Sequence, residues 1–440
     1  MKEKDYVYYP LRRIKDSEDL LSITKGQGIY VWDDKGKKYI DGQCGLWNVS
    51  LGYGNEGIVK AITEQLNNIA YVNTCDYTNP VIKELGQKLI SIMPQGFNKV
   101  FYTCTGSESV ELCIKLVRKY HKLKGNEKKN TIAVFESSYH GTYYGAMSAS
   151  RLEDDFKKDY GPFLQGFKAV KVPFCRCCTI DNVSEKCLQG FLQDLRNTIE
   201  ENKETLAAFI LEPILGSAGV IPIPLEYMKE LKCLCVENDI LLICDEVATG
   251  FGRSGKLFAF EHYGIKPDMV SLSKGINSGY LPFGAVVIEE KITNLLEETN
   301  SMVLHLSTQN GNPLACASAL ANINVILEGD YVNKVREKGI YLKEKLQAML
   351  EDHPMVFDIR GQGLMLAVDL VEDKQTNAMI NSEKLINIIK LFEKRGLLIG
   401  MYNNIKYSSS GLVIFLPFII EEEELDKIAE LFEKVFKRVV

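Results

Sequence analysis

Six short apolar segments alternate with helix-like segments through the middle of the chain. They span residues 100–104, 131–135, 206–211, 239–244, 269–273 and 283–288. Strands that are apolar on both faces and separated by helices are typical of a mostly parallel sheet that is covered on both sides. The sequence therefore predicts an α/β fold built on such a sheet.

The flanking regions have a different pattern. IYVW (29–32) and KKYID (37–41) flank the turn residues DDKG, which predicts a β-hairpin. Towards the C-terminus a long helix precedes alternating strand and helix signals, which indicates a smaller α+β domain. We expect residues 61–328 to form the large domain and residues 329–440 the small one, with residues 1–60 contributing to the small domain.

Charge and hydropathy exclude several classes of function. The 440 residues include 52 Lys and Arg against 58 Asp and Glu, a net charge of −6, so there is no basic footprint for nucleic acid. No basic run indicates an anionic membrane. The first ten residues lack the apolar stretch of a signal peptide, and the apolar stretch 412–420 is too short to span a bilayer. We expect a soluble, cytoplasmic protein.

The chain has twelve cysteines, most of them single residues in apolar context, where a thiol behaves as a small core residue. Without a secretory signal, a reducing cytoplasm fits better than a disulfide framework. Cys175, Cys177, Cys178 and Cys187 crowd into one segment that could hold zinc. Their spacing departs from the common paired-cysteine ligand pattern, so we interpret the segment as an ordinary loop without a metal, with the zinc alternative left open.

Charged residues follow several of the predicted strands. Ligands of open α/β sheets bind at the carboxyl ends of strands, which is where Glu212, Asp245 and Lys274 lie. A desolvated lysine has a lowered pKa, which makes its amine available to attack carbonyls. The alternatives are a lysine whose amine reaches water and a structural ion pair of Asp245 with Lys274 or Arg253.

Two further loops suggest a phosphorylated ring. Thr105, Gly106 and Ser107 begin a predicted helix, where backbone N–H groups could bind phosphate; a plain N-cap is the alternative. Tyr139 could stack on a planar ring and His140 could form a hydrogen bond nearby, although tyrosine-rich loops often only pack. With the lysine and aspartate, these residues outline a site for a planar, phosphorylated, aldehyde-bearing cofactor that has a ring nitrogen.

Three motifs occur in the order CDEVATGFGRSG, SLSKGINSGYLPFGAV and STQNGNPLACASA. With them the chain resembles, from residue 25 to its end, the class III aminotransferases, which are pyridoxal-phosphate enzymes of fold type I. The resemblance implies transamination between an amine or amino acid donor and a keto acid or aldehyde acceptor, in a ping-pong cycle through pyridoxamine phosphate. It also implies a homodimer whose active sites are shared between the subunits.

The resemblance assigns a role to each matching residue. Lys274 matches the lysine that forms an imine with the cofactor and then serves as general base, and Asp245 matches the aspartate that keeps the pyridine nitrogen protonated. The remaining matches are Val247 and Tyr139 on the two ring faces, Gly106 and Ser107 at the phosphate, Thr308 reaching the phosphate from the other subunit, and Glu212 as the family's active-site glutamate.

The segments GLWNVSLGYG and KGINSGYLPFGAV are similar to those of ω-transaminases that use pyruvate. By that similarity Trp47 and Tyr53 line the substrate pocket, with a domain-interface tryptophan as the alternative. Where many class III members have a carboxylate-binding arginine, this chain has Val413. The ω-transaminase pattern leads instead to Lys406, which we expect to pair with the acceptor's carboxylate unless it is a solvated loop residue. Asp76 could select an amine with a second positive charge or simply form a turn.

Two other functions stay open at this point. Decarboxylation, epimerisation or racemisation, and an aminomutase reaction would use the same lysine and aspartate, and a fold does not settle the reaction. A non-catalytic cofactor-binding protein is a second alternative, which the intact lysine and aspartate disfavour. A nucleotide-dependent dehydrogenase is disfavoured because no glycine fingerprint follows the first parallel strand.

Overall fold

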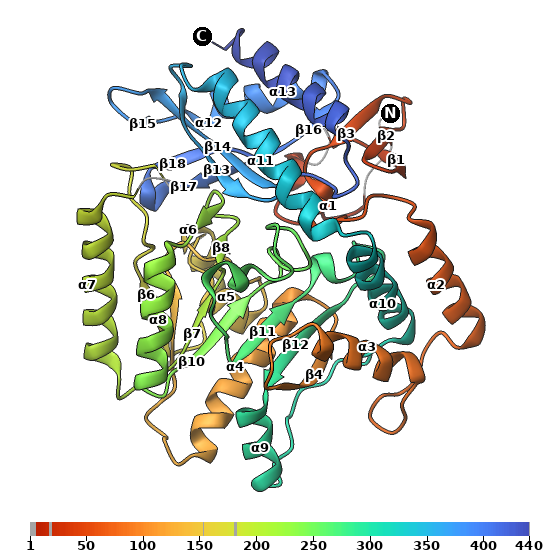
Figure 1. Cartoon of the computed structure of the whole chain (residues 1–440), viewed down its shortest axis with the longest axis vertical. Helices are drawn as coiled ribbons and strands as arrows, with labels where there is room; N and C mark the ends of the chain where they lie inside the picture. The colour runs from red at the N-terminus through yellow and green to blue at the C-terminus, as the bar shows by residue number, and fades with distance from the viewer. Residues whose placement is uncertain (1–5, 17–19, 153, 180–182, 440) are drawn as a thin grey trace.

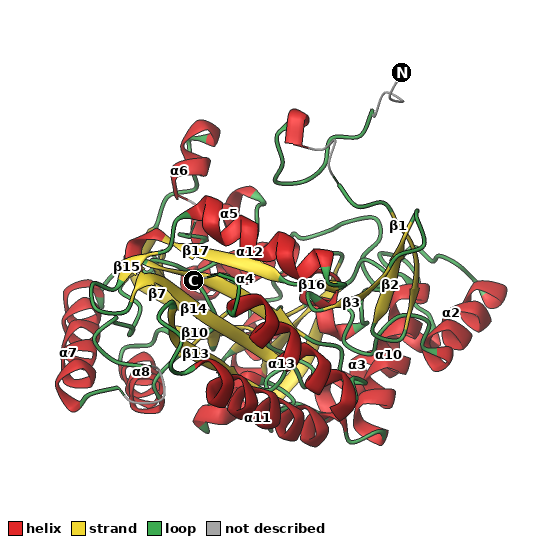
Figure 2. Ribbon diagram, turned by 90° about the horizontal axis from the view of Figure 1, so that it is seen from above, coloured by secondary structure: helices red, strands yellow, loops and turns green. Residues whose placement is uncertain are grey.

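The computed structural model describes residues 6–16, 20–152, 154–179 and 183–439. The chain forms a larger part around a central sheet and a smaller part that contains most of the C-terminal region (Figure 1). In the view of Figure 2, the strands β1 and β2 lie near one end of the molecule and helices α7 and α8 near the other. Among the described residues, no helix combines the length and apolarity needed to cross a membrane.

The central sheet has seven strands in the order β4-β12-β11-β10-β7-β5-β6. All run parallel except β12, which is antiparallel to both of its neighbours, so the predicted mostly parallel sheet is confirmed. The strands are β4 (Phe97–Thr103), β5 (Thr131–Phe135), β6 (Phe167–Val170), β7 (Leu206–Leu211), β10 (Leu241–Asp245), β11 (Met269–Leu272) and β12 (Gly284–Glu289). The edge strand β6 was not predicted, because only one of its four residues is buried and its apolar pattern is weak.

Helices cover both faces of this sheet, which explains why an inner strand such as β7 is apolar on both faces. Successive residues of β5 enter different clusters: Ile132 and Val134 pack with helix α4 (Gly106–Leu123), and Ala133 and Phe135 with helix α8 (Leu225–Glu237). The remaining helices of this part are α2 (Glu56–Asn68), α3 (Pro80–Ser91), α5 (Tyr144–Ala149), α6 (Asp154–Lys157), α7 (Glu185–Asn202), α9 (Glu290–Glu298) and α10 (Pro313–Glu328).

The C-terminal region forms an antiparallel sheet in the order β13-β14-β18-β17, with the short strand β15 beside β14. Helix α13 packs on both α11 and α12, and α11 also contacts β13. The elements are α11 (Tyr331–Leu350), β13 (Val356–Gln362), β14 (Met365–Asp373), β15 (Ala378–Met379), α12 (Ser382–Lys394), β16 (Leu397–Leu398), β17 (Gly400–Asn404), β18 (Ser409–Phe415) and α13 (Glu422–Phe436).

The predicted N-terminal hairpin is confirmed. Strands β2 (Tyr30–Asp33) and β3 (Lys38–Asp41) pair antiparallel, β1 (Ile23–Gln27) pairs with β2, and β16 from the C-terminal region pairs parallel with β3. The hairpin therefore lies beside the C-terminal region. The boundaries expected for the domains, at residues 60 and 328, stay a prediction.

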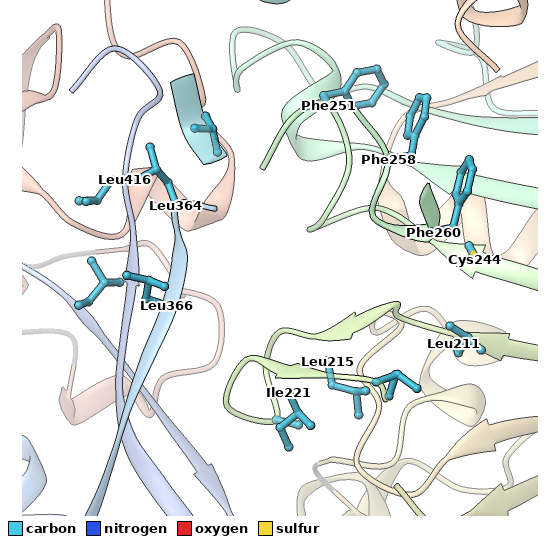
Figure 3. Close-up of a cluster of buried hydrophobic side chains, with 14 of the residues drawn as sticks. Leu211, Leu215, Ile221, Cys244, Phe251, Phe258, Phe260, Leu364, Leu366 and Leu416 are labelled. Atoms are coloured by element: carbon cyan, nitrogen blue, oxygen red, sulfur yellow. The ribbon is translucent and has the colours of Figure 1, made fainter. Parts of the chain in front are cut away.

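One hydrophobic cluster joins the two parts of the molecule. It contains Leu211 and Leu215 from the large part and Leu366 from β14 of the smaller one (Figure 3). The same cluster includes Phe258 and Phe260, whose rings stack with their centroids 5.6 Å apart and their planes 4° apart. Burying apolar surface contributes about 25 cal/mol per Å², so this shared core holds the smaller part against the strand ends of the central sheet.

Candidate active site

A cavity of about 160 Å³ lies at the carboxyl ends of the central strands. The residues that line it are Trp47, Thr105, Gly106, Ser107, Tyr139, His140, Gly141, Glu212, Ser217, Asp245, Val247, Ala248, Ser273 and Lys274. They include all the predicted cofactor residues except Thr308. Two larger hollows of about 570 and 740 Å³ are lined by none of the predicted site residues, so size alone does not identify the site.

Lys274 begins a short 3₁₀ turn directly after β11 and faces the cavity. Its backbone φ is 41°, a left-handed conformation that an L-residue with a long side chain adopts only under constraint from its surroundings. The Nζ atom lies 4.7 Å from the ring centroid of Trp47. Burial lowers the pKa of the Lys274 amine despite the nearby carboxylates of Glu212 and Asp245, so its neutral, nucleophilic form costs less to reach than that of an exposed lysine.

Asp245 is the last residue of β10, and both of its oxygens are engaged. Oδ2 lies 2.7 Å from Nδ1 of the buried His140, and Oδ1 accepts a hydrogen bond from the backbone N–H of Val247 at 3.1 Å. Arg253, the ion-pair partner considered from the sequence, instead donates to the carbonyl oxygens of Leu364 and Leu416. The carboxylate is therefore fixed by an imidazole and a backbone amide.

The buried carboxyl group of Glu212 lies directly after strand β7 and connects two loops at the same edge of the sheet. Its Oε1 accepts from the N–H of Tyr139 at 2.9 Å and its Oε2 from the N–H of Gly216 at 3.0 Å. Burial raises its pKa to about 7, an effect that the charge of His140 and the two backbone donors oppose. Glu212 thus holds two loops together and carries a proton for part of the time at neutral pH.

The start of helix α4 can form an anion-binding site. The side chain of Thr105 caps the helix by accepting from the N–H of Glu108 at 3.1 Å, so the N-cap considered from the sequence is Thr105 and the Ser107 hydroxyl is not used as a cap. The Ser107 hydroxyl faces the cavity and accepts from the N–H of Thr142 at 3.2 Å. A Cβ added at Gly106 would lie 2.8 Å from Val247 Cγ1, so only glycine lets the helix start approach this closely.

The residues present fit pyridoxal phosphate. The first turn of α4 has backbone donors and the positive end of the helix dipole for a phosphate. The amine of Lys274 can react with the cofactor's aldehyde, and the carboxylate of Asp245 can pair with a protonated ring nitrogen. Val247 and Tyr139 can pack against the two faces of the ring. In addition, His140 Nε2 is buried with no hydrogen-bond partner among the described residues, a polar atom that a ligand in the cavity could satisfy.

Four predicted residues lie outside the cavity lining. Tyr53 donates to Asp41 Oδ2 at 2.7 Å, and neither residue lines the cavity. Asp76 is exposed and accepts from the side-chain amide of Asn73 at 2.6 Å, as expected of a turn residue. Thr308 is exposed, as a residue reserved for a second subunit would be, and its predicted role stays a prediction.

Lys406 also lies away from the cavity lining. Its ammonium group donates to the carbonyl oxygen of Glu136 at 2.8 Å and pairs with Asp154 Oδ2 at 3.1 Å. Both partners belong to this chain, so its charge is already matched. Binding a substrate carboxylate would require Lys406 to leave these partners.

Four residues of the cavity lining were not predicted from the sequence: Gly141, Ser217, Ala248 and Ser273. Gly141 has a φ of 114°, and a Cβ there would lie 2.2 Å from Ser107 Oγ, so it allows the Tyr139 loop to approach helix α4. Ser217 lies on the turn between β8 (Ile214–Leu215) and β9 (Ile221–Pro222), close to the backbone that Glu212 holds. Small residues next to chemically informative ones were the only signal available for them.

Known proteins share this sequence and fold. The family described as aminotransferase class-III matches residues 14–436. The chain is 33% identical to the adenosylmethionine-8-amino-7-oxononanoate aminotransferase of Staphylococcus aureus, over 100% of this chain and 97% of that protein. It is also 33% identical to the putrescine–pyruvate aminotransferase of Pseudomonas aeruginosa, over 94% and 89% of the two chains. A PLP-bound amine transaminase from an uncultivated Pseudomonas species superimposes with a TM-score of 0.93 at 29% identity, covering 100% of both chains.

The fold and the cavity define a pyridoxal-phosphate-dependent enzyme of fold type I, as the sequence predicted. Within that class, the chain belongs to the class III aminotransferases, and its reaction is transamination. Its substrates are accordingly small molecules that carry amino and keto groups. The alternative reactions considered from the sequence find no support in these comparisons.

Proposed function

We propose that this enzyme transfers an amino group from an amine or amino acid donor to a small keto acid of the pyruvate type. The cavity that joins Lys274, with its lowered pKa, to the fixed carboxylate of Asp245 carries this conclusion. The relative from Pseudomonas aeruginosa, which is named for its use of pyruvate, supports the choice of acceptor. Two half-reactions that share one cavity make the expected kinetics ping-pong.

We assign the roles of the cavity residues from their chemistry. Bound pyridoxal phosphate supplies an electron sink that stabilises negative charge on the substrate carbon. Lys274 would hold the cofactor through its aldehyde and would supply the base that moves the proton from the substrate carbon. Asp245, oriented by His140, holds a proton at the ring nitrogen.

The remaining cavity residues bind and orient. Gly106 and Ser107 hold the phosphate at the start of α4 and Val247 and Tyr139 enclose the ring. Trp47, whose ring stacks on Phe415 with centroids 4.3 Å apart, forms a rigid wall beside the lysine. We place the substrate against this wall, because an aromatic ring held by stacking offers apolar contact at little entropic cost.

A screen of amines and amino acids with the purified holoenzyme tests the proposal. The cofactor's aldehyde-derived absorbance should convert to that of its amine form, and pyruvate should then restore it with formation of alanine. Replacing Lys274 by alanine should lower turnover by at least about 10³-fold, because it removes both nucleophile and base. Release of CO₂ or racemisation without any acceptor would instead support one of the rival reactions.

We also propose that the enzyme is a homodimer in which Thr308 serves the site of the other subunit. Residues next to it along the chain support an interface, since Met302, Leu304 and Leu306 are 76%, 81% and 67% exposed. Adjacent exposed apolar side chains of this size mark interaction surfaces.

Hybrid dimers test this arrangement. A Lys274→Ala subunit paired with a Thr308→Ala subunit should contain one intact site and recover close to half of the wild-type activity. If Thr308 served its own chain, both sites of the hybrid would lack one group and the hybrid would be no more active than the Thr308→Ala homodimer. Sedimentation analysis of the wild type gives the oligomeric state independently.

We further propose a cytoplasmic location. All twelve cysteines are free thiols in the structure, five of them buried. Proteins of oxidising compartments commonly pair their cysteines, whereas reducing compartments keep them as thiols. Cell fractionation with an antibody against the chain tests this directly.

A further inference from the structure

Four cysteine side chains lie close together, three from the loop after strand β6 and one from the first turn of helix α7. The sulfur atoms of Cys175, Cys177, Cys178 and Cys187 all lie within 4.8 Å of one another. The separations are 2.9 Å for Cys175–Cys177, 3.6 Å for Cys175–Cys187, 3.9 Å for Cys177–Cys178, 3.3 Å for Cys177–Cys187 and 3.7 Å for Cys178–Cys187. The cluster is absent from the cavity lining and has no part in the proposed reaction.

These separations match a tetrahedron of sulfur atoms. A Zn²⁺ ion holds each thiolate at about 2.3 Å, which places neighbouring sulfurs about 3.8 Å apart. Four of these five pairs lie between 3.3 and 3.9 Å, and the Cys175–Cys177 pair is shorter at 2.9 Å. A disulfide would require about 2.05 Å between two sulfurs, whereas the shortest of these five separations is 2.9 Å and all four cysteines are free.

The backbone around the cluster supports it as a ligand set. The N–H of Ser184 donates to Cys178 Sγ at 3.3 Å, the kind of hydrogen bond that stabilises negative charge on a sulfur. The Ser184 hydroxyl caps helix α7 by accepting from the N–H of Cys187 at 3.3 Å, which fixes the fourth cysteine in the first turn of the helix. Cys175, Cys177 and Cys178 are thereby brought to a sulfur that is 12, 10 and 9 residues away along the chain.

The loop that carries the first three cysteines is anchored to the C-terminal sheet. Arg176, between two of them, forms hydrogen bonds of 3.0 and 3.2 Å with the two carboxylate oxygens of the buried Asp369 on β14. Its guanidinium group also lies 4.3 Å from the ring centroid of Phe357. A cross-link at the cysteines would therefore stiffen a contact between the two parts of the molecule.

We propose that Cys175, Cys177, Cys178 and Cys187 bind one Zn²⁺ ion in a closed structural site. Four thiolates complete a tetrahedral shell and leave no open position for a substrate or water, as in other structural zinc sites. Binding releases the protons of the thiols, so affinity rises with pH. The spacing that argued against zinc in the sequence is compatible with it here, because the fourth ligand comes from a separate helix.

Metal analysis of the full-length holoenzyme tests the site. Protein expressed with added zinc and purified with a reductant should contain about one zinc per chain. Cys177→Ser and Cys187→Ser should each lower the zinc content at least fivefold, and Cys75→Ser and Cys233→Ser, which change exposed thiols elsewhere, should retain it. Chelation should also lower the Tm of the wild type, with a smaller change in the Cys187→Ser variant.

A second measurement does not depend on the variants folding. Replacement of zinc by Co²⁺ in the wild type should give the intense thiolate charge-transfer and visible bands of a tetrahedral site. Less than about one tenth of a zinc per chain, with no uptake of Zn²⁺ or Co²⁺ by the reduced protein, would overturn the proposal. So would iron or copper in place of zinc, or an intact mass 2 or 4 Da low that shows the four sulfurs to be disulfide-bonded.

Discussion

The pKa of Glu212 depends on how strongly the active-site cavity disfavours negative charge. Its carboxyl group is buried beside Asp245, and burial raises its pKa from 4.5 to about 7. Between these two values the native state binds the proton more tightly than the unfolded state does. The contribution of Glu212 to the free energy of unfolding therefore falls as the pH rises through this window, which is the opposite of the usual behaviour of an ion-paired carboxylate.

Replacing Glu212 by glutamine removes this dependence. At 1.36 kcal/mol for each pH unit of displacement, the buried carboxyl group costs the wild type about 3 kcal/mol at pH 8, and about 2.5 kcal/mol of that develops between pH 5 and pH 8. An unfolding entropy of about 2.1 cal/mol/K per residue, applied to a chain of this length, converts this to about 3 °C in Tm. In the variant, the NH₂ group of the glutamine faces one of the two backbone N–H donors that the carboxylate accepts from, and the lost hydrogen bond is destabilising. This penalty does not depend on pH, so it cancels when the change in Tm with pH is compared between the two proteins.

The assay is the Tm of cofactor-free protein, measured from pH 5 to pH 8 for the wild type and for Glu212→Gln. The wild type should lose about 3 °C relative to the variant across this range. Glu226→Gln, which changes an exposed glutamate on α8, should follow the wild type at every pH. Parallel Tm curves for the wild type and Glu212→Gln would show that Glu212 ionises as it does in water and would refute the reasoning.

Three further substitutions test the assigned roles. Asp245→Asn should lower kcat by about 10²-fold, about 2.7 kcal/mol, and shift the cofactor's absorbance, whereas Asp194→Asn on the surface should change neither. Gly106→Ala should raise the Kd for pyridoxal phosphate at least about tenfold, because overpacking costs about 1–3 kcal/mol, and Gly190→Ala, where a Cβ meets open space, should leave it unchanged. Lys406→Ala should raise the KM for pyruvate at constant kcat; an unchanged KM would leave Lys406 with a surface ion pair only.

The parts of the fold that were predicted well are those whose local pattern has one physical explanation. The segment 206–211 coincides with strand β7, because six consecutive apolar residues between turns suit a strand that is buried on both faces. The predicted hairpin near residue 35 followed in the same way from turn residues between two strand-like segments. Strand β6 was not predicted, because an edge strand buries little side-chain surface and therefore needs no run of apolar residues.

The residues of the candidate site also differ in how well the local sequence pattern predicted them. Lys274, Asp245 and Glu212 could be recognised because charged residues directly after apolar strands have few structural explanations, and parallel strands bring their ends together. The substrate residues had no such signal. Tyr53, Asp76 and Lys406 were placed by similarity alone, and each has a polar partner within this chain outside the cavity lining.

The sequence by itself determined the sheet, the cofactor chemistry and the family, because periodicity and charge at strand ends are local properties of the chain. Only the tertiary structure decided which distant groups meet. It paired His140 with Asp245 across 105 positions, and it brought Cys187 to the three cysteines of a separate loop. The physical reason is that hydrogen bonds and metal coordination depend on distances of a few ångströms, which the spacing of residues along a folded chain does not fix.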